Sequence, residues 1–371
     1  MSCFASPVCT NLSAPAVPVS GLETRATAPR VRLAFLDALR ALGSLAVFGY
    51  HAALEIAPSW AIFFSTRFDL GHFGVVLFFL CSGFIIPVSL ERHRSLRRFW
   101  INRVCRLYPL YWCSAVVVVA GFVLIAPGGR LAEGWSQFRM ASHTPVTVLA
   151  NLTMLQSFLG RPDLMGVYWT LAFELMFYSI VSLLFIARLL RHSVLLAVGF
   201  ALAALLVEVV LPRLTGLRAA PGAMTFLALM FAGTVLGRRV EGSVTSTAAW
   251  AVIGVALLLV LAIMLASPRD PFAMSTLTAI GLARLAAIVV FVGGLSLRGI
   301  GVPRMVLYLG QISYSLYLWH TFVIIAIPPT GPIALTVLLW LFVLVGVAAL
   351  TYRWVERPGM ALGRWVTART A

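Results

Sequence analysis

The chain has 371 residues, of which 61% are hydrophobic and only 11% are charged. A soluble globular domain carries about 25% charged residues, so this composition excludes that class and indicates an integral membrane protein. The formal net charge is +16 and there is no lysine. Such a balance can indicate nucleic-acid binding, but these arginines fall between apolar stretches, as in cytoplasmic loops of membrane proteins, so no nucleic-acid partner is expected.

Residues 1–30 are expected to form a disordered cytoplasmic tail. They are rich in Ser, Ala, Pro and Thr, a composition that does not support a packed core. A signal peptide needs an apolar central region of about 7–15 residues, which this segment lacks. The remainder is expected to divide into a transmembrane domain over 31–358 and a short cytoplasmic tail over 359–371.

Ten apolar stretches follow in chain order. A stretch of about 20 apolar residues crosses the bilayer as a helix, and the runs are continuous rather than alternating, which argues against a barrel. We therefore predict an all-α polytopic membrane protein with about ten transmembrane helices, N-in and C-in. The predicted spans lie near 33–53, 72–90, 105–126, 167–187, 193–211, 222–237, 248–267, 273–295, 304–327 and 333–352.

The arginines set the predicted orientation. With the N-terminus inside, nineteen arginines flank the inner ends of the spans and seven flank the outer ends, as the positive-inside rule requires. The longest loop, roughly 127–166, then faces outside. Within it, the half-apolar stretch 145–160 is interrupted by Asn151, Gln156 and Ser157, so we predict that it is re-entrant or interfacial.

The first predicted span contains Arg40 and His51. Eleven residues at about 100° each complete three turns to within about 20°, so both side chains share one helix face, about 16 Å apart along the axis. Ionisable residues inside a span usually face the bundle interior or a wet cavity. The alternative is that Arg40 reaches the inner interface and pairs with Asp37, while His51 caps the outer end.

A dense basic run, ERHRSLRRFWINRVCRLYP, follows the second span. Arg103 and Arg106 are spaced i, i+3 and therefore share a helix face. Two guanidinium groups at a cytoplasmic helix start suit a phosphate-bearing ligand. An ordinary positive-inside anchor is the alternative interpretation.

The fourth and ninth spans carry further polar groups. Glu174 lies in an apolar helix and needs a partner; it can orient a histidine, or it can tie helices together structurally. Ser313, Tyr317 and His320 make ISYSLYLWH unusually polar, although an interfacial aromatic belt would have a similar pattern. In ERP, at 356–358, the proline is predicted to stop the last helix. Five cysteines without metal-ligand spacing predict neither a metal site nor a disulfide framework.

These segments together resemble the bacterial acyltransferase family 3, the membrane O-acyltransferases. RALGSLAVFGYH resembles its motif of Arg, ten residues and His, and GVVLFFLCSGFII with FWINRVCRLYP resembles its Arg-x-x-Arg region. VYWTLAFELMFY resembles its Trp-Ser-Leu-x-x-Glu-x-x-Phe-Tyr motif, and ISYSLYLWH with ERP completes the set. Two positions depart from the family: Thr170 replaces a usual Ser, and Val76 replaces a common Asp.

The resemblance implies transfer of an acyl group, commonly acetyl, from cytoplasmic acyl-CoA to a hydroxyl. Typical acceptors are sugars of surface polysaccharide, lipopolysaccharide or lipid-linked glycans, and some members act on antibiotics. It places the chain in the bacterial cytoplasmic membrane.

From the residues and the resemblance together we expect the following site. Arg103 and Arg106 bind the acyl-CoA phosphates, and Arg40 lines the thioester path. His51 is the general base, or carries a transient acyl group, and Glu174 orients it or completes the site. Acceptor-binding residues are expected among Trp169, Tyr178, Ser313, Tyr317 and His320. A glycan transporter or flippase would also explain the spans and charges, although no inverted repeat is apparent. A sensor or scaffold would leave the intramembrane charges without purpose.

Overall fold

The computed structural model describes residues 33–125, 144–216, 222–267 and 275–369. The chain divides after Leu33 into a short N-terminal unit and a large one. The predicted tail over 1–30 lies outside the described residues. Within those residues every regular element is a helix, which confirms the all-α prediction.

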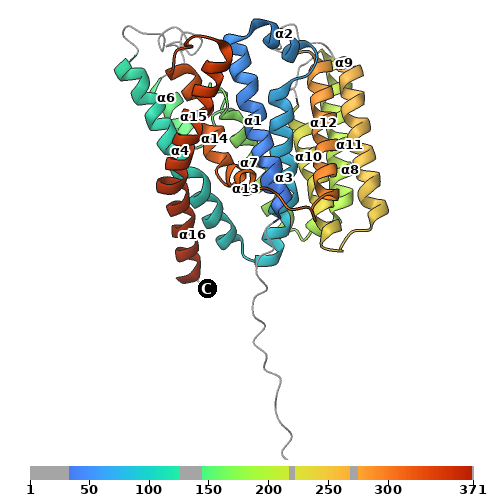
Figure 1. Ribbon diagram of the computed structural model, residues 1–371. Coiled ribbons are helices and arrows are strands. Elements are labelled where there is room, and N and C mark those ends of the chain that lie inside the picture. The colour runs from blue at the N-terminus through green and yellow to red at the C-terminus, as the bar shows by residue number, and fades with distance from the viewer. Residues whose placement is uncertain (1–32, 126–143, 217–221, 268–274, 370–371) are drawn as a thin grey trace, which may run out of the picture. The chain divides into compact units, whose positions relative to one another are not determined.

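The helices follow one another along the chain and mostly run side by side in the bundle (Figure 1). Their bounds are α1 (Ala34–Ile56), α2 (Pro58–Thr66), α3 (Leu70–His93), α4 (Leu96–Ile125), α6 (Pro145–Leu152), α7 (Trp169–Ile186), η2 (Leu190–His192), α8 (Ser193–Leu205), η3 (Leu206–Val210), α9 (Leu211–Thr215), α10 (Ala223–Val240), α11 (Ser246–Ala266), α12 (Leu277–Ser296), α13 (Arg304–Gln311), α14 (Ser313–Ala326), α15 (Ile333–Thr351), η4 (Tyr352–Glu356) and α16 (Arg357–Arg369).

Eight helical segments within the described residues are long and apolar enough to cross a membrane. The two other predicted spans correspond to α1 and to the pair α13 and α14. The helix α1 carries Asp37, Arg40 and His51, and it packs against α3, α12, α13 and α14 rather than facing only lipid. A helix lined by protein can carry polar groups that lipid would not tolerate. The polytopic fold is confirmed, and the count of ten remains a prediction.

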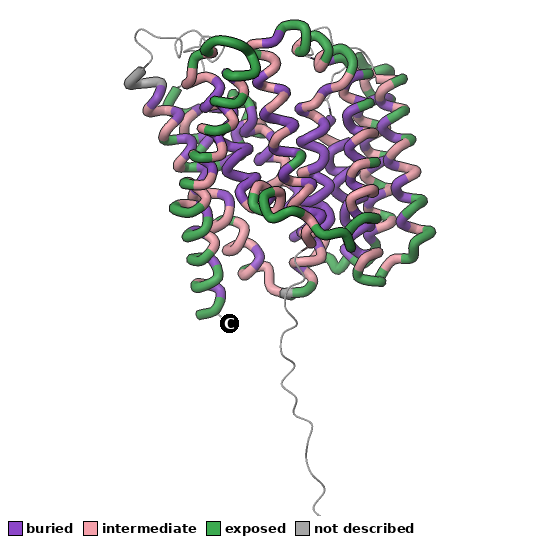
Figure 2. The backbone as a smooth tube through the Cα atoms, viewed as in Figure 1, coloured by how far each residue is buried: buried purple, intermediate pink, exposed green. Residues whose placement is uncertain are grey.

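The helices α3 and α10 pack most closely where glycines face the neighbouring backbone. A methyl group at Gly83 would lie 1.9 Å from the Met230 carbonyl oxygen, and one at Gly233 would lie 2.5 Å from the Leu80 carbonyl oxygen, so both would collide. Small residues allow such close approach, which is how helices associate in membranes. The contact buries the centre of the bundle (Figure 2) and fixes the rotation of α3, which carries Ser82 toward α7.

The last helix does not stop where the sequence predicts. Pro358 lies inside a continuous helical segment from Ile333 to Arg369, so the predicted tail over 359–371 is largely helical. A π-helical turn, η4, precedes α16 and places Pro358 near its start, where the missing N–H costs little. Packing of Gly359 and Gly363 on α4 around Cys105 then holds the segment in place.

The stretch 145–160 contains the short helix α6 followed by turns. Eight residues rise only about 12 Å, so α6 cannot cross a bilayer, which agrees with the predicted re-entrant or interfacial placement. The buried Asn151 side chain accepts a bond from Leu164 N at 2.9 Å and donates to Thr147 O and Pro162 O, each at 2.9 Å. These three hydrogen bonds fix the loop that leads into α7.

Candidate active site

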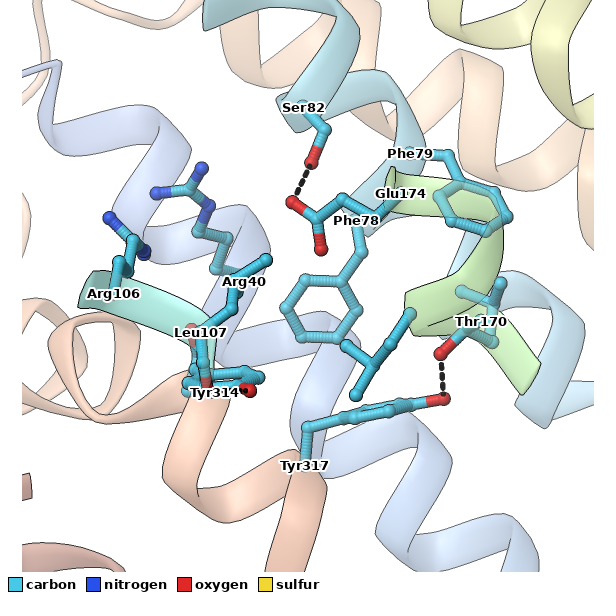
Figure 3. A pocket seen from close by; sticks show the side chains of 13 residues that line it. Arg40, Phe78, Phe79, Ser82, Arg106, Leu107, Thr170, Glu174, Tyr314 and Tyr317 are labelled. Carbon is cyan, nitrogen blue, oxygen red and sulfur yellow. Dashed lines mark hydrogen bonds between the residues drawn. The ribbon is translucent and has the colours of Figure 1, made fainter. Parts of the chain in front are cut away.

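A pocket opens between α1, α3, α4, α7 and α14. Its empty space is about 590 Å³, counted with the solvent at its mouth. Figure 3 shows Arg40 and Arg106 gathered on one side, with Glu174 and Ser82 facing them and the rings of Phe78 and Tyr317 along another side. It is lined by Arg40, Val75, Phe78, Phe79, Ser82, Arg106, Leu107, Thr170, Leu171, Glu174, Ser313, Tyr314 and Tyr317.

Glu174 projects from α7 into this pocket. Its carboxylate accepts hydrogen bonds from Ser82 Oγ at 3.3 Å and from the Tyr178 hydroxyl. Tyr178 is one helical turn further along α7, so these two residues form an i, i+4 pair. The carboxylate forms part of the pocket wall and makes no hydrogen bond to His51. Of the two roles expected for Glu174, this arrangement suits completing the site rather than orienting His51.

The two arginines of the Arg-x-x-Arg segment have different surroundings. Arg106 lines the pocket with Arg40, whereas Arg103 packs over the rings of Phe99 and Tyr178, 5.6 and 5.7 Å from their centroids. The buried Nε of Arg103 has no hydrogen-bond partner among the described residues. Arg106 is therefore the arginine of this pair that lines the pocket.

A second carboxylate, Glu356, belongs to this group and received no role from the sequence. It is 1% exposed and accepts a hydrogen bond from Ser315 Oγ at 2.9 Å. Its charged neighbours are Arg106 and Arg40. The ERP triplet signalled the position, but only the π-helical turn η4 shows that the side chain enters the bundle.

Three arginines and two glutamates thus lie around the pocket: Arg40, Arg103 and Arg106 with Glu174 and Glu356. The guanidinium groups of Arg40 and Arg106 line the pocket, and such groups can bind an anionic ligand that accepts several hydrogen bonds.

His51 meets His320 rather than a carboxylate. Nδ1 of His51 lies 2.9 Å from the Val47 carbonyl and 3.3 Å from Nε2 of His320. Nδ1 of His320 lies 2.6 Å from the Tyr317 carbonyl. A carbonyl only accepts, so each Nδ1 carries its proton.

This tautomer assignment leaves Nε2 of His320 as an acceptor and Nε2 of His51 with an open lone pair. Within the described residues, no hydrogen bond engages that Nε2. An unprotonated imidazole nitrogen without a partner is the form a general base requires.

Tyr317 connects the histidine pair to the pocket. Its ring lines the pocket, meets Phe78 edge-on at 5.6 Å and lies 5.6 Å from the His320 ring. The Tyr317 hydroxyl and Thr170 Oγ1 are 2.9 Å apart, so the threonine at this position still supplies the hydroxyl that the usual serine would.

The other expected acceptor residues separate into two places. Ser313 lines the pocket and Tyr178 lies beside it through Glu174, but Trp169 packs against Phe226 at 5.7 Å, on the side of α10. Val76, which replaces a common Asp, is completely buried.

Comparison with known proteins places these residues in context. A family model for an acyltransferase domain matches residues 33–353. Exopolysaccharide production protein ExoZ of Rhizobium meliloti (strain 1021) is 30% identical over 327 residues, covering 80% of this chain and 92% of that protein. Acyltransferase MdmB of Streptomyces mycarofaciens is 28% identical over 333 residues, covering 80% of each.

A third relative matches over a shorter region. Peptidoglycan O-acetyltransferase OatA of Listeria monocytogenes is 34% identical over 155 residues, which cover 39% of this chain and 23% of that protein. No solved structure matches the chain significantly.

Proposed function

This chain belongs to the acyltransferase family whose domain spans residues 33–353, and we propose that this membrane O-acyltransferase transfers an acetyl or similar acyl group from cytoplasmic acyl-CoA to a hydroxyl of a glycan. The observation that carries the proposal is the order of three features along one face of α1. The Arg40 pocket, the Tyr317 ring that lines it and the His51–His320 pair beside that ring follow one another, and we propose that the acyl donor takes this path. A transporter has no need of an unprotonated, unpartnered imidazole at the end of such a path.

The donor occupies the end of the path that holds the arginines. Arg106 and Arg40 face the pocket together, and guanidinium forks bind phosphate oxygens in two-bond geometry. The acyl-CoA arm then extends along α1 toward His51, about 16 Å away along the helix axis. Its route passes Phe78 and Tyr317, whose rings form an apolar wall suited to an uncharged chain.

His51 performs the proton transfer. Nε2 accepts the proton of the acceptor hydroxyl while that oxygen attacks the thioester carbonyl carbon, giving a tetrahedral intermediate. When the carbon–sulfur bond breaks, the CoA thiolate takes the proton back from the imidazolium, and the ester leaves. The Nδ1 bonds to Val47 and His320 keep the imidazole in the tautomer and orientation that this exchange needs.

The names of two relatives support the proposed acceptor class. ExoZ is named for exopolysaccharide production and OatA for O-acetylation of peptidoglycan, so we propose a sugar of a surface polysaccharide, lipopolysaccharide or lipid-linked glycan. The similarity to MdmB keeps a secondary metabolite as the second candidate. The protein would act in the bacterial cytoplasmic membrane, taking the donor from inside and the acceptor from outside.

The direct test measures label transfer from radioactive acetyl-CoA to glycan in membranes that contain the full chain. His51→Ala should lower the rate at least about 100-fold, because positioned base catalysis contributes about 10²–10⁴. His192→Ala, which changes an exposed histidine outside the site, is the matched control and should transfer normally. Equal rates for His51→Ala and wild type would overturn the proposed base, and no label in any glycan with the wild type would overturn the proposed acceptor.

A further inference from the structure

A second cluster of ionisable side chains lies outside the donor pocket, around Arg284 on α12. Arg284 is only 5% exposed. Its guanidinium makes no hydrogen bond or ion pair with any described residue, and its Nε is buried without a partner. A guanidinium has five donors, and a buried charge left without partners costs several kcal/mol. Such a group inside a membrane span indicates a binding function.

The Arg284 guanidinium is held in place by the Phe226 ring and by the backbone at Gly222. It lies over the Phe226 ring, 5.2 Å from the centroid. On another side it touches Gly222, where a methyl group would come within 2.6 Å of Nη2. Gly222 has φ of 87°, a conformation that glycine adopts readily. The backbone at this position therefore gives the guanidinium room without offering it a hydrogen bond.

The nearest carboxylates are engaged elsewhere. Glu208 accepts from Thr225 N at 2.9 Å and from Thr225 Oγ1 at 2.8 Å. Asp69 accepts from His72 N at 2.8 Å and pairs with His72 Nδ1 at 3.0 Å. Both influence Arg284 electrostatically, but neither satisfies its donors.

The net charge of Arg284 and its neighbouring carboxylates favours an uncharged ligand. Burial alone would raise the pKa of the Asp69 carboxyl, but the bonds and charge of His72 outweigh it, and the pKa lies below its usual value. With Asp69 and Glu208 ionised and Arg284 charged, the sum is −1 with neutral His72 and zero with protonated His72. An anionic ligand would meet no net positive charge, whereas the hydroxyl oxygens of an uncharged sugar accept from the guanidinium without adding charge.

The cluster also lies beside the path of the proposed reaction. Phe79 lines the donor pocket and contacts Phe226 at 5.0 Å, so one aromatic layer separates Arg284 from that pocket. Trp169, one of the expected acceptor residues that do not line the pocket, contacts the same Phe226 ring. On α1, Tyr50 OH lies 3.4 Å from Ser275 Oγ, and Asp69 is a charged neighbour of His51.

We propose that Arg284 binds the hydroxyl groups of an uncharged sugar of the acceptor, stacked near Trp169, and thereby presents a neighbouring hydroxyl to His51. The inference rests on the proposed acyl transfer to a glycan and names the acceptor subsite. It predicts that two arginine sites bind different substrates: Arg40 and Arg106 bind the anionic donor, and Arg284 binds the neutral acceptor.

The test uses the purified full chain in nanodiscs with labelled acetyl-CoA. The acceptor probe is surface polysaccharide of the host, de-O-acylated with mild base, cut to oligosaccharides and separated into neutral and acidic fractions. Arg284→Lys keeps the charge and loses the fork, and Arg284→Gln keeps amide donors and loses the charge. Both should raise the KM for neutral oligosaccharides at least tenfold and leave the KM for acetyl-CoA within twofold. Arg213→Lys, an exposed arginine of α9, is the matched control and should change neither.

The outcomes separate the two hypotheses. If the wild type transfers no label to either fraction, the proposed function fails. If the wild type transfers label and both Arg284 variants keep the acceptor KM, or lose only transfer to the acidic fraction, the sugar subsite is wrong. Loss of acetyl-CoA binding in both variants would show a structural role for Arg284 and would also overturn the subsite.

Discussion

At the scale of single residues, the contact between His51 and His320 joins two helices that are distant in sequence. Nε2 of His320 also accepts a hydrogen bond from Thr321 Oγ1 at 3.1 Å. Because this nitrogen already accepts from two donors, it is not open to the proton of a substrate and cannot itself be the base. We therefore propose His320 as a positioning residue, because its acceptor nitrogen holds the Nδ1 proton of His51 and leaves Nε2 of His51 open.

Replacing His320 should therefore slow catalysis without weakening the donor site. We expect His320→Leu to lower kcat about 10–100-fold, comparable to loss of an orienting partner, with an unchanged KM for acyl-CoA because His320 does not line the pocket. His320→Gln, whose amide oxygen can take the place of Nε2, should recover part of the rate. Equal loss in both variants, or a raised donor KM, would contradict the positioning role.

The two arginines of α4 should also differ. Arg106 faces the pocket, while Arg103 packs on Phe99 and Tyr178. Arg106→Lys should weaken binding of a non-hydrolysable acyl-CoA analogue about tenfold, because a lysine cannot form the two-bond fork. Arg103→Lys should weaken it less. Isothermal titration of the purified protein checks the order, and a stronger effect at Arg103 would show that the donor phosphates lie on the other side of α4.

Sequence reasoning found the ionisable residues of the site but not their partners. Helical periodicity places Arg40 and His51 on one face because that relation lies within one helix. The contacts between Glu174 and Ser82, and between His51 and His320, join different helices, so no spacing within one segment could predict them. The same limit hid Glu356, whose direction depends on a π-helical turn.

At the scale of elements, the positions of α3 and α10 are set by glycines without which the helices could not meet. Gly83→Ala should lower the stability of the protein by about 1–3 kcal/mol, the usual cost of overpacking, because the Met230 carbonyl cannot move away easily. The melting temperature in detergent, followed by size-exclusion chromatography after heating, measures this effect.

A matched variant separates crowding from a general effect of glycine replacement. Gly254 on α11 has no neighbouring atom within 4 Å of an added methyl group, so Gly254→Ala should leave the melting temperature unchanged or raise it slightly through better helix propensity. Similar decreases in melting temperature for both variants would mean that crowding at the α3–α10 contact is not the cause of the lost stability.

The length of apolar runs predicted most helices of the bundle. It failed where contacts with other helices determine where a helix ends or breaks. The continuous runs of α8, α11 and α15 are unambiguous because they face apolar surroundings on most sides. Conversely, Pro358 predicted a helix end that packing on α4 overrides, and α13 and α14 divide at Ile312 within one apolar run. Breaks and π-helical turns depend on tertiary contacts, which a single sequence does not contain.

At the scale of the whole molecule, the mechanism needs a fixed direction across the membrane. The basic segments between α3 and α4 and along α16 lie toward one end of the helical bundle in Figure 1, while α2 lies toward the other. By the positive-inside rule we expect the first of these ends to be cytoplasmic. In that orientation Arg106, eight residues after Arg98 on α4, would open toward the proposed donor, and His51, near the far end of α1, would lie toward the proposed acceptor.

This orientation can be measured with single cysteines in a background whose five native cysteines are replaced. Ser243 between α10 and α11 and Ser59 in α2 are both exposed. We expect a cysteine at 243 to react with a membrane-impermeant maleimide only in inside-out vesicles, and a cysteine at 59 only in right-side-out vesicles. Acetyl-CoA added to the outside of sealed vesicles should then support transfer only in the inside-out preparation.

The two measurements constrain each other, because labelling reports only where the ends lie and transfer reports which end admits the donor. If labelling shows the reverse orientation while transfer still requires acetyl-CoA at the end that carries position 243, the donor pocket is correct and the positive-inside rule fails for this chain. If labelling agrees but transfer proceeds only with acetyl-CoA at the end that carries position 59, the arginines around the pocket do not bind the donor. The arginine-rich end would then anchor the protein at the membrane surface, and the His51 end would have to admit both substrates.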